Sequence, residues 1–158
     1  FKGVRQPFET ETSMSGFLTG EKHFLILQGD KGTGKTYASM AICELFTQKN
    51  HSCIFTTQKK MMSNWLATFK SDQVNNYINK ITTVELLVID DFGTGKLESG
   101  FMTFFMDLLN TRMQWRKRKT IITTNLKDDE LILTCGDSLA DRLRTGIILQ
   151  FQGNSRRF

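Results

Sequence analysis

The sequence predicts an α/β fold with a parallel β-sheet, and three observations support that prediction. Short apolar runs alternate along the chain with segments whose apolar residues recur at helical spacing. Residues 29–36 (GDKGTGKT) match the phosphate-binding loop pattern G-x-x-x-x-G-K-[ST] at every fixed position. Residues 85–93 (ELLVIDDFG) hold an apolar run that ends in two acids, as expected of a strand covered on both faces.

The first half of the predicted fold alternates strands and helices. Residues 23–28 (HFLILQ) are short and apolar, which indicates a buried strand, and helical spacing of apolar residues follows over 37–48. Residues 52–57 (SCIFTT) predict a second strand, and residues 72–80 a weaker helix. Between them, 60–69 predict an amphipathic helix with five apolar side chains expected in the core: Met61, Met62, Trp65, Leu66 and Phe69.

The second half repeats the alternation. The acidic strand at 85–93 is followed by a long helix rich in phenylalanine and leucine, and then by the β-rich run TIITT. Gly136 is expected to break the next helical stretch in two. The remaining elements are predicted at 97–115 (helix), 120–124 (strand), 128–133 and 137–144 (helices) and 147–151 (strand).

The glycine-rich loop predicts a nucleotide site. Backbone N–H groups and the positive end of the following helix would bind the phosphates, and Gly29, Gly32 and Gly34 would let the backbone approach them. Lys35 would reach the β- and γ-phosphates, and the Thr36 hydroxyl would ligate Mg²⁺. A glycine-rich turn with a solvated lysine is the alternative. The other predicted nucleotide-binding residues are Asp30, Lys31, Thr33 and Tyr37.

Two acids complete the predicted site. The carboxyl ends of parallel strands meet at the edge where open α/β sheets bind ligands. There Asp90 would hold the Mg²⁺ shell, and Asp91 would orient or deprotonate the attacking water. Taken alone, either acid could instead be a helix N-cap or a turn former.

Composition places the chain among globular proteins. Its 158 residues are 39% hydrophobic and 23% charged, with a net charge of +5 that is compatible with nucleic acid binding. No apolar stretch approaches the ~20 residues of a membrane span, and the first residues lack a signal-peptide core. We therefore expect a cytoplasmic protein with no membrane contact. Because the chain starts at Phe1, we expect it to be part of a longer one. His23 and His51 lack the spacing of zinc ligands.

Cysteine usage and one basic run give two further expectations. Cys43, Cys53 and Cys135 stand far apart, which suits a reducing compartment, and the first two are expected to be buried thiols. Residues 116–119 (RKRK) are expected to end the long helix, where basic side chains complement the helix dipole. The run is either a solvated helix end or a DNA contact.

At these motifs the sequence resembles the AAA+ ATPases, and within them the DnaC/DnaI-type bacterial replicative helicase loaders, with the IstB transposition ATPases as close relatives. The resemblance starts near residue 24 and rests on GDKGTGKT, LLVIDDFG, TIITTN, and DSLADRLR followed by a strand and Ser155-Arg156. It implies a P-loop NTPase of the AAA+ type: three α/β/α layers and a five-stranded parallel sheet in the order 5-1-4-3-2. Residues 52–57 lie between the two nucleotide motifs, as that order needs.

The resemblance also implies roles for three further residues. Asn125 matches the polar sensor that holds the attacking water or the γ-phosphate. Arg142 matches the arginine finger, which the family supplies to the ATP of a neighbouring subunit, and Arg156 matches the second sensor arginine. By chemistry alone, Arg142 and Arg144 could equally be surface arginines on a short helix.

The chain departs from the family pattern in two ways. Many AAA+ proteins have glutamate where Asp91 stands, so slow turnover is expected. Seven residues follow the fifth predicted strand, so no C-terminal lid domain is expected. We expect residues 1–20 to be a lead-in, with residues 1–7 near the adenine, and residues 21–158 to be the ATPase domain. The helicase-binding domain of the loaders is expected to be absent from this chain.

The resemblance implies an ATP-dependent switch in replication initiation. Copies of the chain would assemble through the Arg142 interface, hold single-stranded DNA and help to place a ring helicase on it, with Lys59 and Lys60 as DNA-contacting candidates. An IstB-like transposition helper and a phage-type interaction or inhibitor module with little ATPase activity are the alternatives. A small-molecule kinase has the least support, because no lid with catalytic arginines is visible.

Overall fold

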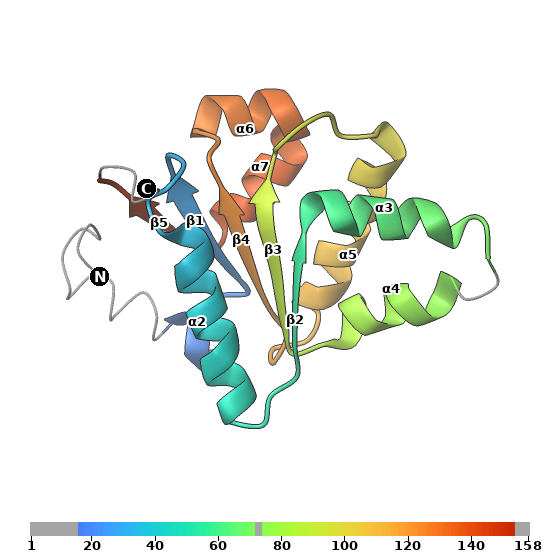
Figure 1. The fold of residues 1–158 in the computed structure, drawn as a ribbon, viewed down its shortest axis with the longest axis horizontal. Helices are drawn as coiled ribbons and strands as arrows, with labels where there is room; N and C mark the ends of the chain where they lie inside the picture. The colour runs from blue at the N-terminus through green and yellow to red at the C-terminus, as the bar shows by residue number, and fades with distance from the viewer. Residues whose placement is uncertain (1–15, 72–73, 154–158) are drawn as a thin grey trace.

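The sheet has the predicted topology. A computed structural model describes residues 16–71 and 74–153, and its five strands all pair in parallel in the order β2-β3-β4-β1-β5 (Figure 1). From the β5 edge this order is 5-1-4-3-2, so the predicted fold class is confirmed. The strands are β1 (Phe24–Gly29), β2 (Cys53–Thr57), β3 (Leu86–Phe92), β4 (Lys119–Thr124) and β5 (Ile147–Phe151).

Helices cover both faces of the sheet, which gives three layers (Figure 1). α2 packs on one face with helical residues 16–19, and helices α3 to α7 pack on the other. Among the described residues, no helix combines the length and apolar character that crossing a membrane requires. The helices are α2 (Lys35–Gln48), α3 (Gln58–Thr68), α4 (Val74–Thr83), α5 (Ser99–Met113), α6 (Asp128–Cys135) and α7 (Asp137–Arg144).

Strand residues alternate between two separate cores. In β1, Leu25 and Leu27 join the core under α2, whereas Phe24 and Ile26 join the core under the other helices. Successive side chains of a strand point to opposite faces, so a strand covered on both faces is apolar throughout. Phe17, which precedes β1, is fully buried in the core under α2.

The core residues predicted for the helix at 60–69, which is α3 in the structure, are only partly correct. Met61 of α3 is fully buried, but Leu66 is 45% exposed and Phe69 is 71% exposed. α3 packs beside edge strand β2 and contacts the core along one stripe, and Phe69 lies past the last helical residue. Trp65 lies between these positions and stacks on Phe104, with ring centroids 5.8 Å apart.

The basic run does not end a helix, so that prediction is wrong. α5 ends at Met113, and a turn closed by the bond from Arg118 N to the Trp115 carbonyl (3.0 Å) follows it. Lys119 is the first residue of β4. Its backbone N–H donates to the backbone carbonyl of Glu85 at 2.7 Å, which places the residue in the sheet. Its buried amine donates to the Lys22 carbonyl at 2.8 Å.

Two of the cysteines form a disulfide, so the expectation of buried thiols is wrong for them. Cys43 lies on α2 and Cys53 begins β2, and the chain reversal between these elements brings their Cα atoms to 6.1 Å. That separation is within the range that a disulfide spans. Cys135 is a free thiol, and burial raises its pKa to about 11.

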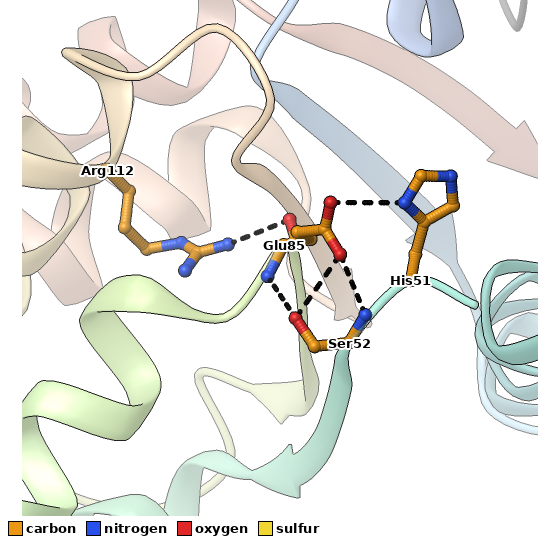
Figure 2. A network of polar contacts seen from close by, with 4 residues as sticks. All are labelled: His51, Ser52, Glu85 and Arg112. Carbon is orange, nitrogen blue, oxygen red and sulfur yellow. Dashed lines mark hydrogen bonds and ion pairs between the residues drawn. The ribbon is translucent and has the colours of Figure 1, made fainter.

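A buried arginine joins several elements at the amino edge of the sheet. The Arg112 guanidinium donates to the carbonyls of Ile81 (2.9 Å) and Val84 (2.8 Å) near the end of α4, and to that of Lys119 (2.7 Å) in β4. Figure 2 shows it beside Glu85, whose carboxylate accepts hydrogen bonds from Ser52 and His51. These bonds lower the pKa of Glu85. The cluster fixes the edge of the sheet opposite the phosphate loop.

Candidate nucleotide-binding site

The phosphate loop lies between β1 and α2 as predicted, but its glycines are required for different structural reasons. Gly32 and Gly34 adopt left-handed backbone conformations, with φ of 77° and 96°, and no atom lies near the place where a Cβ of Gly34 would be. This leaves the loop open to a ligand. A Cβ on Gly29 would overlap the carbonyl oxygen of Phe151. Gly29 therefore permits the pairing of β1 with β5, a role the sequence did not indicate.

Lys35 places a positive charge within the loop. The side chain is buried, and its amine donates to the carbonyls of Gly29 (2.6 Å) and Asp30 (2.7 Å). It is also the first residue of α2, whose positive end points into the loop. Positive charge and the backbone amides of the helix start are therefore concentrated where an anionic ligand would bind.

The first acid of β3 faces the start of α2. The Thr36 hydroxyl lies 3.0 Å and 3.1 Å from the two carboxylate oxygens of Asp90, which is buried. On the other side, Thr123 of β4 donates to Asp90 Oδ1 at 2.6 Å. The fold thus brings together the two predicted metal ligands, Thr36 and Asp90, and both present oxygen, the donor atom that Mg²⁺ prefers.

The two acids lie in a β-bulge of β3, which turns their side chains to different sides. Ile89 pairs with Ile122 and Phe92 with Thr124, so Asp90 and Asp91 both lie opposite Thr123. Asp91 has a φ of 55°, a left-handed conformation that aspartate tolerates better than most residues. The bulge lets consecutive residues serve one site: Asp90 points inward, and Asp91 is exposed at the loop.

Most of the predicted site residues line one cavity of about 350 Å³. Its lining comes from the phosphate loop, the start of α2, the end of β3 with the turn after it, and the residue after β4. The lining residues are Lys31, Gly32, Gly34, Lys35, Thr36, Tyr37, Asp91, Thr94 and Asn125. Asn125 lines a neighbouring cavity of about 440 Å³ toward β5 as well. Asp30 lines that second cavity and not the first. Asn125 therefore lines the same cavity as Lys35 and Asp91, and its role as a polar sensor stays a prediction.

The structure does not bring Arg142 into this site. Its guanidinium packs on the Met113 sulfur at the end of α5, 3.8 Å away, and it lines neither of these cavities. An arginine that acts on a neighbouring subunit need not reach the nucleotide of its own chain, so its role stays a prediction. Arg144 pairs with Asp141 at 2.9 Å. Arg156 and residues 1–7 lie outside the described residues.

Two polar residues beside the acids were missed from the sequence. Thr123 joins Asp90 to the backbone N–H of Asp91, which donates to its hydroxyl at 3.0 Å. Gln58, fully buried at the start of α3, accepts a hydrogen bond from Gly93 N just after the bulge. The only signal for Thr123 is a polar residue in a strand that is otherwise expected to be buried.

The comparison with protein families agrees with this site. Residues 11–158 match the family described as IstB-like ATP binding protein. The chain belongs to this family. It is therefore an ATP-binding domain of an ATPase family. The replicative helicase loader DnaC of Escherichia coli K12 is 30% identical over 123 residues, which cover 77% of this chain and 50% of DnaC. The chain spans about half the length of the curated relatives it matches.

Solved structures confirm the fold. A crystal structure of the DnaC helicase loader has a TM-score of 0.79 at 19% identity and covers 96% of this chain and 92% of its own. The replication initiator DnaA bound to AMPPCP and single-stranded DNA has a TM-score of 0.83 at 18% identity, covering 98% of this chain and 48% of its own. At these identities the likeness shows the shared AAA+ fold.

Proposed function

We propose that this chain is the ATP-hydrolysing part of a switch that loads a replicative DNA helicase onto single-stranded DNA during replication initiation. Membership of the IstB-like family and the similarity to the helicase loader DnaC support this proposal. The observation that carries its enzymatic part is the contact of the Thr36 hydroxyl with buried Asp90, at the end of a loop that also holds the Lys35 amine.

The site residues suit a magnesium-bound nucleoside triphosphate. Loop amides and Lys35 would hold the phosphates, with exposed Tyr37 at the mouth of the cavity. Mg²⁺ would be held by the Thr36 hydroxyl and the Asp90 carboxylate, and when bound it neutralises phosphate charge. Thr123 would keep the Asp90 carboxylate in place through its 2.6 Å hydrogen bond.

The residues around the cavity would have different roles in hydrolysis. Asp91 would orient the attacking water or take its proton, because its carboxylate is exposed in the cavity. Asn125 would hold the water or the terminal phosphate, and Lys35 would stabilise the charge that develops on phosphate oxygens. Arg142 would act on the nucleotide of a neighbouring copy, which makes turnover depend on self-association.

The partners would be single-stranded DNA and a ring helicase. Lys59 and Lys60, both exposed near the start of α3, are the DNA-contacting candidates. Phosphate contacts of this kind weaken steeply with salt. Helicase contact would use a region of the full protein outside this chain, since the chain spans about half of its relatives.

Steady-state ATP hydrolysis and nucleotide binding, measured with and without single-stranded DNA, test the proposal. Lys35→Ala should lose nucleotide binding. Arg142→Ala should still bind nucleotide but lose about 10³-fold in assembly-dependent turnover. Arg144→Ala, which removes a surface ion pair on the same helix, is the matched control and should behave as the parent. Unchanged nucleotide affinity of Lys35→Ala would refute the site.

A transposition helper of the IstB type is the second candidate, because the matching family carries that description. A preference for double-stranded over single-stranded DNA in the same assays would favour it. Nucleotide binding with background turnover would instead favour an interaction or inhibitor module, which the short side chain of Asp91 motivates.

A further inference from the structure

A second cavity lies at the amino edge of the sheet, away from the phosphate loop. It measures about 600 Å³ and is bounded by the second half of α2, residues 18–20 and the turn before β4. Ile42 and Phe46 contribute partly buried apolar side chains to it. Leu18 and Leu45, which also line it, are each 56% exposed. We call this surface, defined by these four residues and the cations below, the amino-edge groove.

Positive charges surround the groove, and they lack acidic partners among the described residues. Lys49, Arg116 and Lys117 line it and are exposed, and none of them forms an ion pair within the described part of the chain. Of the described residues in its lining, Glu85 alone carries a carboxylate, and hydrogen bonds from Ser52 (2.9 Å) and His51 (3.1 Å) already engage it (Figure 2). The groove therefore presents an apolar interior with unbalanced positive charge around it.

We propose that the amino-edge groove binds an acidic amphipathic segment of a partner protein. Large apolar side chains of that segment would fill the cavity between Ile42 and Phe46 and cover Leu18 and Leu45. Its aspartates and glutamates would face Lys49, Arg116 and Lys117. Apolar anchors supply most of the affinity in such interfaces, and the surrounding charges select the partner and speed its association.

Two features of the groove favour a protein segment over other ligands. A nucleic acid backbone would satisfy the cations but would leave the apolar interior without contacts. A small anionic molecule held inside the cavity would leave Leu18 and Leu45 exposed to water, whereas a peptide laid across the groove covers both.

Within residues 16–71 and 74–153, the groove and the nucleotide cavity share no lining residue. The phosphate loop follows the carboxyl end of β1, whereas Glu85 immediately precedes β3 at its amino end. A partner held in the groove would therefore leave access to the nucleotide unchanged. The proposal goes beyond ATP binding, and it can fail while the proposed function stands.

A display library of short random peptides, selected on the parent chain, tests the proposal. The selected peptides are then synthesised with a fluorescent label and titrated by fluorescence anisotropy. We expect them to combine Asp and Glu with large apolar residues. Leu45→Asp and Lys117→Glu should each weaken binding at least about tenfold. The matched controls are Leu133→Asp, an exposed leucine on α6, and Lys80→Glu, an exposed lysine on α4. Both should bind as the parent does.

Five results would overturn the proposal. Four of them are failure to enrich any peptide, enrichment of peptides without acids, equal affinity of the groove variants and the parent, and dimerisation of the parent that the groove variants abolish, because the occupant is then a second copy. A single-stranded oligonucleotide that binds at Lys117 but is indifferent to Leu45→Asp would assign the surface to nucleic acid. Circular dichroism and unchanged nucleotide binding confirm that each variant is folded.

Discussion

The hydroxyl of Thr123 donates a hydrogen bond of 2.6 Å to Oδ1 of buried Asp90. The same hydroxyl accepts the backbone N–H of Asp91 across the bulge of β3. One side chain of β4 thus fixes the direction of both acids in the neighbouring strand. The precision of the candidate metal and water positions depends on a residue that touches neither proposed ligand.

Thr123→Val should lower ATP turnover about 10–100-fold and raise the Mg²⁺ concentration needed for half-maximal rate. Valine keeps the shape of threonine but cannot donate to Asp90, so the carboxylate loses its orientation. Magnesium titration of turnover measures the effect. Thr56→Val is the control, because its buried hydroxyl donates to the Thr57 carbonyl and contacts neither acid. An unchanged magnesium requirement in Thr123→Val would contradict the positioning role.

Asp91→Asn should retain nucleotide affinity and lose about 10²–10⁴-fold in turnover. Asparagine tolerates the left-handed backbone at this position, so the substitution removes the negative charge without disturbing the bulge. Binding of a fluorescent ATP analogue and single-turnover hydrolysis separate the two effects. Full hydrolysis by the asparagine variant would exclude Asp91 as the base.

Arg112→Met should lower the free energy of unfolding by about 3–5 kcal/mol. Methionine fills similar space but leaves the buried carbonyls of Ile81, Val84 and Lys119 without their donor. Urea denaturation measures the loss. Arg118→Met removes only a cation held 4.7 Å over the Trp115 ring, so it should cost about 1 kcal/mol or less. Equal losses in the two variants would show that the buried hydrogen bonds carry little stability.

Lys119 should make a contribution to stability that rises with pH above 8. Burial, and secondly the charge of Arg116, lower the pKa of Lys119 from 10.5 to about 8. Between these values the unfolded chain binds more protons than the folded one, so the free energy of unfolding increases with pH, by about 2 kcal/mol over the window. Below pH 8 this contribution is flat. Denaturation of the parent and Lys119→Met across pH 8–10.5, the window set by the two pKa values, should show a free energy of unfolding that changes less favourably with rising pH in the variant. Parallel curves would contradict the burial of a charged amine.

Reduction of the Cys43–Cys53 disulfide should destabilise the chain by about 2–3 kcal/mol, because the bond closes a loop of 10 residues in the unfolded state. Thermal melts with and without reductant measure the change. Cys135→Ser should keep the sensitivity, and the Cys43→Ser/Cys53→Ser double variant should lose it. Alkylation of three thiols in the untreated native chain would show that the bond is absent.

The sequence predicted the strands and the phosphate loop because both depend on local patterns, whereas the strand order was implied by the resemblance to the AAA+ ATPases. The loop at 29–36 needs a fixed spacing of glycine, lysine and threonine, and the apolar run of β3 needs only cover on both faces. The predicted end of the long helix failed at Lys119. There, pairing of the backbone with Glu85 overrides the helix-end pattern of a basic run.

From the amino-acid sequence alone, Lys35, Thr36 and Asp90 could be identified as candidates for binding phosphate and metal, and that role stays a prediction. Only the tertiary structure decided how Thr123 orients the acids, why Gly29 must lack a side chain beside Phe151, and which cysteines pair. The physical reason is the distance along the chain between the residues that interact. Helical spacing, strand alternation and loop composition are properties of neighbouring residues, whereas these contacts join strands and helices that meet only after the sheet has assembled.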